Sequence, residues 1–254
     1  MKLEIFGMTD IGSVRENNED NFIVFNVDKK EENPFLKELS TDDRIALIVA
    51  DGMGGAVAGE TASITLITES MKFLNDVVEM EIEKIPTECM HLAHKRSHEL
   101  IEENPKLMGM GTVATISIVQ NNKIYISQIG DTRLYIFRDK TLIQITEDQN
   151  FVTELVKLGI ITKEQALIHP QRNAVTQAVG SLEPILPVDV IETIYPNDLI
   201  LICSDGLNSM ITDLEIQLIL ETDESIQEKT ENLIEAAKES GGHDNITIVL
   251  ARVI

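Results

Sequence analysis

Five aspartates stand close to apolar runs of the sequence, and most of them have a glycine nearby: Asp20, Asp51, Asp131, Asp205 and Asp244. Asp51 directly follows the apolar run 45–50, and Asp205 follows the run 199–203 after one serine. Burying an unpaired carboxylate is costly, and few basic residues are near these positions in the sequence. Divalent cations would neutralise several carboxylates at once. Because all these donors are oxygens, the pattern favours Mg²⁺ or Mn²⁺ over Zn²⁺.

The same aspartates have a simpler interpretation, because Asp-Gly pairs are common in turns. For any one of the five, a turn is the better explanation. Five such positions together favour a shared metal site. Their spacing does not by itself show that they meet.

The overall charge excludes some classes of partner. The chain has 254 residues, with 43 acidic and 21 basic side chains and a formal net charge of −22. Such a surface repels nucleic-acid backbones and anionic lipid. Most of the excess charge is expected to serve solubility. The sequence therefore predicts a protein that binds neither nucleic acid nor membrane.

The remaining composition points to one cytoplasmic domain. No apolar run of about 18 residues is present, and the N-terminus lacks the long apolar core of a signal peptide. Cys89 and Cys203 are too few and too unpatterned for a disulfide framework. No linker or internal repeat divides the chain, so we expect a single domain over residues 1–254.

Apolar patterns place these aspartates at the ends of strands. Strands are predicted around Leu3 and Ile5 and at 22–25, 45–50, 113–119, 123–129, 133–137, 187–194, 199–203 and 246–253. Helices are predicted at 58–74, 83–102, 150–158, 162–168, 213–220 and 225–239. Strands come in runs and do not alternate strictly with helices. This order favours an α+β protein with antiparallel sheets and outer helices.

Six short motifs resemble those of the type 2C (PPM) metal-dependent Ser/Thr protein phosphatases, in family order. They are residues 12–22 (GSVRENNEDNF), 49–55 (VADGMGG), 111–115 (GTVAT), 129–133 (IGDTR), 203–207 (CSDGL) and 242–247 (GHDNIT). Each motif is weak alone, but six in order over nearly the whole chain are specific. The second has the form found in bacterial members. The resemblance implies a four-layer α-β-β-α sandwich of two antiparallel sheets flanked by helices.

The resemblance also implies a set of site residues. Asp51 would bridge two ions, Mn²⁺ or Mg²⁺, with the Gly52 carbonyl as a further ligand. Asp205 and Asp244 would bind one of these ions, and Asp20 the other. Asp131 would contribute to a third, weaker site. Arg15 would bind the substrate phosphate, while Glu19 and Asn245 would support the ligands from behind.

These residues fit hydrolysis of phosphoserine and phosphothreonine in proteins. Two ions about 3.5–4 Å apart lower the pKa of a bridging water and screen the phosphoryl charge. The guanidinium fork of Arg15 matches phosphate oxygens. The expected partners are phosphorylated proteins, among them a Ser/Thr kinase and its substrates.

Two positions depart from the family pattern. Met53 stands where eukaryotic members carry a histidine thought to act as general acid, and Ser209 stands where some members carry an acidic residue. Residues 146–180 correspond to the variable flap of bacterial members, and we expect this insertion to contact substrate. A plain surface insertion is the alternative.

Other functions remain open from sequence. A phosphoprotein-binding pseudophosphatase would keep the cleft without the metals, and a partner-switching phosphatase would act on one small regulator. A metal-dependent nuclease is opposed by the charge. Ser204 lacks the surroundings of a hydrolase nucleophile.

One segment that contains histidines and a cysteine could in principle bind zinc. Cys89, His91, His94 and His98 are spaced along one predicted helix. We expect the three histidines to lie on the solvent side of that helix, opposite an apolar face that contains Cys89.

Overall fold

The computed structural model describes residues 1–32 and 35–254 and contains two six-stranded sheets. The first sheet has the order β4 (Phe35–Ser40), β1 (Lys2–Asp10), β12 (Ile246–Val253), β11 (Leu199–Cys203), β8 (Arg133–Arg138) and β9 (Thr141–Gln144). The second has the order β10 (Val188–Thr193), β7 (Lys123–Ile129), β6 (Gly111–Gln120), β5 (Ile45–Met53), β2 (Asn21–Asn26) and β3 (Glu31–Glu32). All strand pairs that join these elements are antiparallel.

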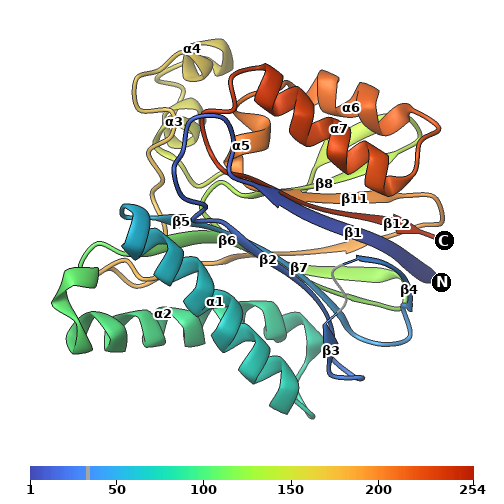
Figure 1. Cartoon of the computed structure of the whole chain (residues 1–254), viewed down its shortest axis with the longest axis horizontal. Coiled ribbons are helices and arrows are strands. Elements are labelled where there is room, and N and C mark those ends of the chain that lie inside the picture. Colours follow the sequence, from blue (N-terminus) through green and yellow to red (C-terminus); the bar gives the residue numbers. More distant parts are fainter. Residues whose placement is uncertain (33–34) are drawn as a thin grey trace.

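Helices cover the outer face of each sheet, as Figure 1 shows. Helices α1 (Ala56–Asp76) and α2 (Ile85–Glu103) lie against the second sheet. Helices α5 (Asp205–Asn208), α6 (Asp213–Glu221) and α7 (Ile226–Glu239) lie on the side of the first sheet. Short 3₁₀ turns at Ile82–Lys84 and Pro105–Leu107 flank α2. The result is the predicted four-layer α-β-β-α sandwich.

The central strands are apolar on both faces because each separates two cores. In β5, Ile45, Leu47 and Val49 point into the core between the sheets. The alternate residues Ala46 and Ile48 point toward α1 and α2, as the two-residue period of a strand requires.

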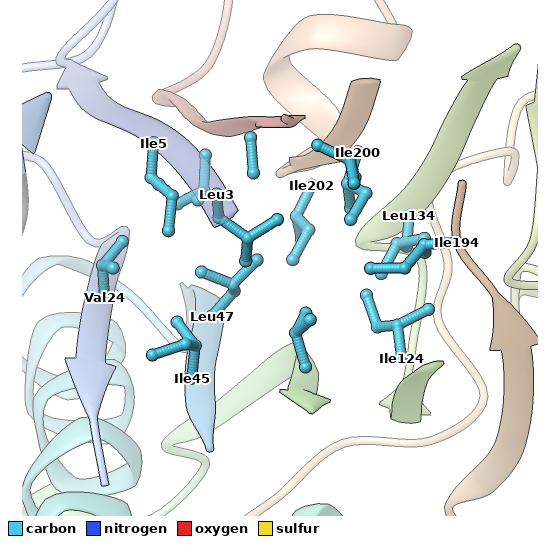
Figure 2. Close-up of a cluster of buried hydrophobic side chains, with 14 of the residues drawn as sticks. Leu3, Ile5, Val24, Ile45, Leu47, Ile124, Leu134, Ile194, Ile200 and Ile202 are labelled. Carbon is cyan, nitrogen blue, oxygen red and sulfur yellow. The ribbon is translucent and has the colours of Figure 1, made fainter. Parts of the chain in front are cut away.

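The core between the sheets is built from aliphatic side chains. Figure 2 shows Leu3, Leu47 and Ile202 among those that meet there. In the first sheet, Ile200 and Ile202 point inward, whereas Leu201 and Cys203 face the helices. This packing fixes the ends of β5 and β11 relative to each other, and the predicted aspartates follow at those ends.

Residues between β9 and β10 carry the predicted insertion. Helices α3 (Phe151–Lys157) and α4 (Lys163–Leu167) lie there, at one end of the sandwich in Figure 1. Thr162 and Gln165 form a capping box at the start of α4. Both cysteines are buried and unpaired, as predicted. Over the described parts of the chain, the helices are too short or too polar to cross a bilayer.

Candidate active site

The five predicted aspartates lie at strand ends of both sheets. Asp20 immediately precedes β2, and Asp51 lies near the end of β5. Asp131 lies in the turn from β7 to β8, which joins the two sheets. Asp205 begins α5 just after β11, and Asp244 lies two residues before β12. The two sheets therefore bring together carboxylates that are up to 224 positions apart in the sequence, Asp20 and Asp244.

Most of the predicted site residues line one cavity of about 310 Å³. Its walls include Arg15, Glu19, Asp51, Gly52, Asp131, Asp205, Asp244 and Asn245. Asp20 is only 5% exposed and lies outside this lining. The structure thus brings the predicted set together, with Asp20 buried below the cavity surface.

Burial and mutual repulsion make these carboxylates hard to ionise. Burial, together with the charges of Asp20 and Asp205, raises the pKa of Asp51 well above its ordinary value. Burial likewise raises the pKa of Asp205 to about 6 and that of Asp131 to about 8. A cavity with this charge distribution favours cations.

Asp20 is held by two polar groups from the other sheet. Burial raises its pKa to about 7, and hydrogen bonds from Ser204 and Thr247 oppose that rise. Ser204 Oγ donates to Asp20 Oδ2 at 2.7 Å and accepts from the Thr247 backbone nitrogen at 2.9 Å. No role for Ser204 was predicted from the sequence. Its position directly before Asp205 is the feature of the sequence that could have indicated a role in the site.

Arg15 points into the cavity toward a predicted metal ligand. Its Nη2 lies 2.6 Å from Asp244 Oδ2. This hydrogen bond is the main reason that the Arg15 pKa is raised. Among the described residues, Arg15 is the one basic side chain that lines the cavity.

Asn245 joins its own loop to the segment 11–20 between β1 and β2. Its side-chain oxygen accepts from the Glu19 backbone nitrogen at 2.8 Å. Its amide nitrogen donates to the carbonyls of Ile11 at 3.0 Å and Asn17 at 2.9 Å. These bonds fix the segment that carries Arg15, Glu19 and Asp20, so Asn245 positions these residues.

The glycines around Asp51 serve two different purposes. Gly54 and Gly55 have φ values of 116° and 87°, so they need the conformational freedom of glycine. Gly52 is required for another reason. A Cβ atom there would lie 2.3 Å from the Gly59 carbonyl oxygen and 2.6 Å from that of Glu19. Helix α1 therefore packs directly against the segment that carries Asp51.

The insertion lies beside the cavity. Asn173 and Val175 line the acidic cavity, and Arg172 lines an adjoining one of about 220 Å³ with Asp131 and Ser209. A β-bridge between Asn150 and Val175 joins the two ends of the segment that contains α3 and α4.

The prediction for the three helix histidines was partly wrong. His91 is exposed, but His94 and His98 are half-buried and contact each other, with their Nε2 atoms 3.2 Å apart. His94 Nδ1 also accepts a hydrogen bond from the Gly180 backbone nitrogen at 3.1 Å. Burial, then His98 and His91, lower the His94 pKa. The prediction failed because residues 178–180 fold back over this face of α2.

The donors of the acidic cavity suit a hard divalent ion. Over residues 1–32 and 35–254, no three acidic, histidine or cysteine side chains already stand as ligands around one point. Asp244 is turned to Arg15, and Asp51 shares a hydrogen bond with Asp205. All the donors are oxygens with surplus negative charge, which is the chemistry that Mg²⁺ and Mn²⁺ prefer. The residues fit such ions once these side chains turn toward them.

Comparison with known proteins agrees with this geometry. The model of the family "Protein phosphatase 2C" matches residues 35–250. The serine/threonine phosphatase stp of Listeria welshimeri is 35% identical over 247 residues, which cover 95% of this chain and 92% of that protein. Protein phosphatase PhpP of Streptococcus pneumoniae is 33% identical, covering 98% and 96% of the two chains.

Solved structures show the same fold. The S. agalactiae serine/threonine phosphatase has a TM-score of 0.87 at 30% identity, with 99% of this chain and 100% of that chain covered. The catalytic domain of the phosphatase PstP, solved in complex with two manganese ions, has a TM-score of 0.83 at 32% identity, with 100% and 99% covered. The chain therefore belongs to the protein phosphatase 2C family and is a protein phosphatase.

Proposed function

We propose that this protein hydrolyses phosphoserine and phosphothreonine in other proteins with the help of two divalent ions, Mn²⁺ or Mg²⁺. The observation that carries the proposal is the acidic cavity at the ends of both sheets, with Arg15 reaching into it. The relatives named serine/threonine phosphatase and the manganese complex of PstP support the same reaction and metal.

The carboxylates of the cavity would hold the ions. Asp51 would be a ligand of both ions, and the Gly52 carbonyl would be a further ligand. Asp205 and Asp244 would hold one ion, and Asp20 would hold the other. Asp131 would serve a third, weaker site. When bound, the ions would lower the pKa of a water that they share and offset the charge of the phosphoryl group.

Arg15 would exchange partners as substrate binds. In the structure its guanidinium is paired with Asp244, which is itself a proposed ligand. A phosphate group offers the same guanidinium two oxygens in a matching plane. Transfer of Arg15 to the phosphate would release Asp244 and hold the phosphorus in place for attack.

The insertion would form part of the substrate surface. We propose that the chain is a single domain with residues 146–180 as a flap, since Asn173 and Val175 already line the cavity. The substrates would be phosphorylated proteins, including a Ser/Thr kinase.

One assay tests the reaction. Peptides carrying phosphoserine, phosphothreonine or phosphotyrosine are incubated with the protein and Mn²⁺, Mg²⁺ or a chelator, and phosphate release is measured. We expect release from the first two peptides with metal and none with chelator. Hydrolysis that persists at full rate in chelator, or a preference for phosphotyrosine, would refute the proposal.

A further inference from the structure

Another cavity, of about 240 Å³, is lined mainly by apolar groups and shares Met53 with the acidic cavity. We propose that it binds an apolar side chain of the substrate, two residues away from the phosphorylated serine or threonine. The cavity is lined by Met53, Ile101, Met108, Gly109, Met110, Gly111, Ala178, Gly180, Ser181 and Leu182. This inference rests on the proposed function, because it names the sequence that the same site would select.

The two cavities share their walls. Met53 lines both of them. On β6, Val113 lines the acidic cavity and Gly111 the apolar one. The segment after α4 also contributes to both cavities: Val175 lines the acidic cavity, and Ala178 lines the apolar one. A bound peptide could therefore reach from one cavity to the other.

The spacing of residues along β6 gives the number of substrate residues that would separate the two cavities. Gly111 and Val113 are two residues apart on a strand, which is about 7 Å at 3.3 Å per residue. An extended peptide has the same rise, and its side chains point to the same face every second residue. A substrate whose phosphorylated residue enters the acidic cavity would thus present the residue two positions away to the apolar one.

The lining is suited to apolar side chains. Among the described residues that form it, none carries a charge, although the protein has a formal net charge of −22. Met108 and Leu182 are 59% and 75% exposed, so they are available for contact. Methionine adapts its shape easily, so we expect leucine, isoleucine and methionine to be accepted alike.

Backbone contacts hold this cavity open without a ligand. Thr112 and Val179 exchange two backbone hydrogen bonds of 2.9 Å, which fix the segment 178–182 to β6. The Gly180 nitrogen donates to His94 on α2. A preformed pocket binds with less ordering cost.

Phosphothreonine peptides with one varied position test the proposal. Leucine, serine or aspartate is placed two residues before or two residues after the phosphothreonine, and kcat/KM is measured with Mn²⁺. We expect leucine at one of these two positions to raise kcat/KM about tenfold over serine. Leucine placed next to the phosphothreonine should have no such effect.

Variants connect the preference to the cavity. Met108→Asp and Leu182→Asp should each bring the leucine-to-serine ratio close to one, whereas Met108→Leu should keep it. Leu214→Asp provides the matched control, because Leu214 is 62% exposed on α6 and lines neither cavity. Thermal melting verifies that each variant is folded.

The outcomes separate this inference from the proposed function. Equal kcat/KM for all peptides in the wild type, or an unchanged ratio in both aspartate variants, overturns the apolar subsite while leaving the phosphatase activity intact. If no phosphopeptide is hydrolysed, the proposed function and this inference both fail.

Discussion

Ser204 Oγ lies 2.7 Å from Asp20 Oδ2, although the two residues are 184 positions apart and come from different sheets. The same oxygen accepts a hydrogen bond from the Thr247 backbone nitrogen. Ser204 itself is fully buried. Its hydrogen bond therefore holds Asp20, a proposed metal ligand, in place and stabilises the buried carboxylate.

Replacing Ser204 with alanine should lower both stability and ion affinity. The change leaves the Thr247 nitrogen without its acceptor and removes one of the two donors to Asp20, so we expect a loss of about 1–3 kcal/mol in the free energy of unfolding. Loss of the group that orients Asp20 should weaken Mn²⁺ binding about 10- to 100-fold. Urea unfolding and calorimetric titration measure the two effects. Ser240→Ala, at an exposed helix end, is the control; equal values in both variants would contradict the role assigned to Ser204.

Asp51→Asn and Asp205→Asn should each reduce Mn²⁺-dependent hydrolysis of an aryl phosphate at least about 100-fold. Each change removes a carboxylate that would face the proposed ions from one of the two sheets. Asp76→Asn, at the exposed end of α1, should retain wild-type turnover. Near-normal rates in a folded Asp51 or Asp205 variant, with circular dichroism as the check, would remove the acidic cavity from the reaction.

The metal-free protein should lose stability as the pH rises from about 4 to about 8. Asp205, Asp20 and Asp131 have pKa values of about 6, 7 and 8, above the ordinary value of 3.8. In this range the folded protein holds protons that the unfolded chain has released, so the free energy of unfolding falls with pH. Melting temperatures in chelator at pH 5.5, 7 and 8.5 test the sign.

Asp205→Asn should flatten this pH profile and stabilise the chelated protein at pH 8.5, because it removes one repelling charge. With Mn²⁺ the wild-type profile should reverse, since the ligands must be deprotonated to bind. A melting temperature of the chelated wild type that rises across this range would show that the repulsion is not the dominant pH effect.

Arg15→Ala should chiefly raise KM, by about tenfold for an aryl phosphate, because a charge-assisted hydrogen bond to phosphate is lost in the ground state. Arg15→Lys should recover part of the affinity, since it keeps the charge but not the fork. Steady-state kinetics at saturating Mn²⁺ separate the two constants. A fall in kcat alone would mean that Arg15 does not bind the phosphate before reaction.

The sequence predicted the central strands and the edge strand β10, but it missed the edge strand β9. Continuous apolar runs such as 45–50 and 199–203 identify strands buried on both faces, and β5 and β11 are found there. The edge strand β9, Thr141–Gln144, was missed because its four residues are only partly buried. Its conformation depends on pairing with β8, which no local pattern records.

Prediction of the site had a similar limit. The aspartates stand out because their charges lie next to or near apolar runs, and the motif resemblance supplied their order. The support from Ser204 and the close approach of Gly52 to Gly59 were not predicted. Both depend on distances between segments that are far apart along the chain.

The placement of the proposed ligands has a consequence for how firmly the two sheets are held together. Asp20 and Asp51 lie in or next to strands of the second sheet, whereas Asp205 and Asp244 lie next to strands of the first. An ion held by Asp51, Asp205 and Asp244 would act as a cross-link between the halves of the sandwich, and its binding free energy would stabilise their contact. At an ion concentration a hundred times the dissociation constant, this contribution would be about 2.7 kcal/mol. Cellular supply of the metal would then regulate how long the folded molecule survives as well as how fast it works.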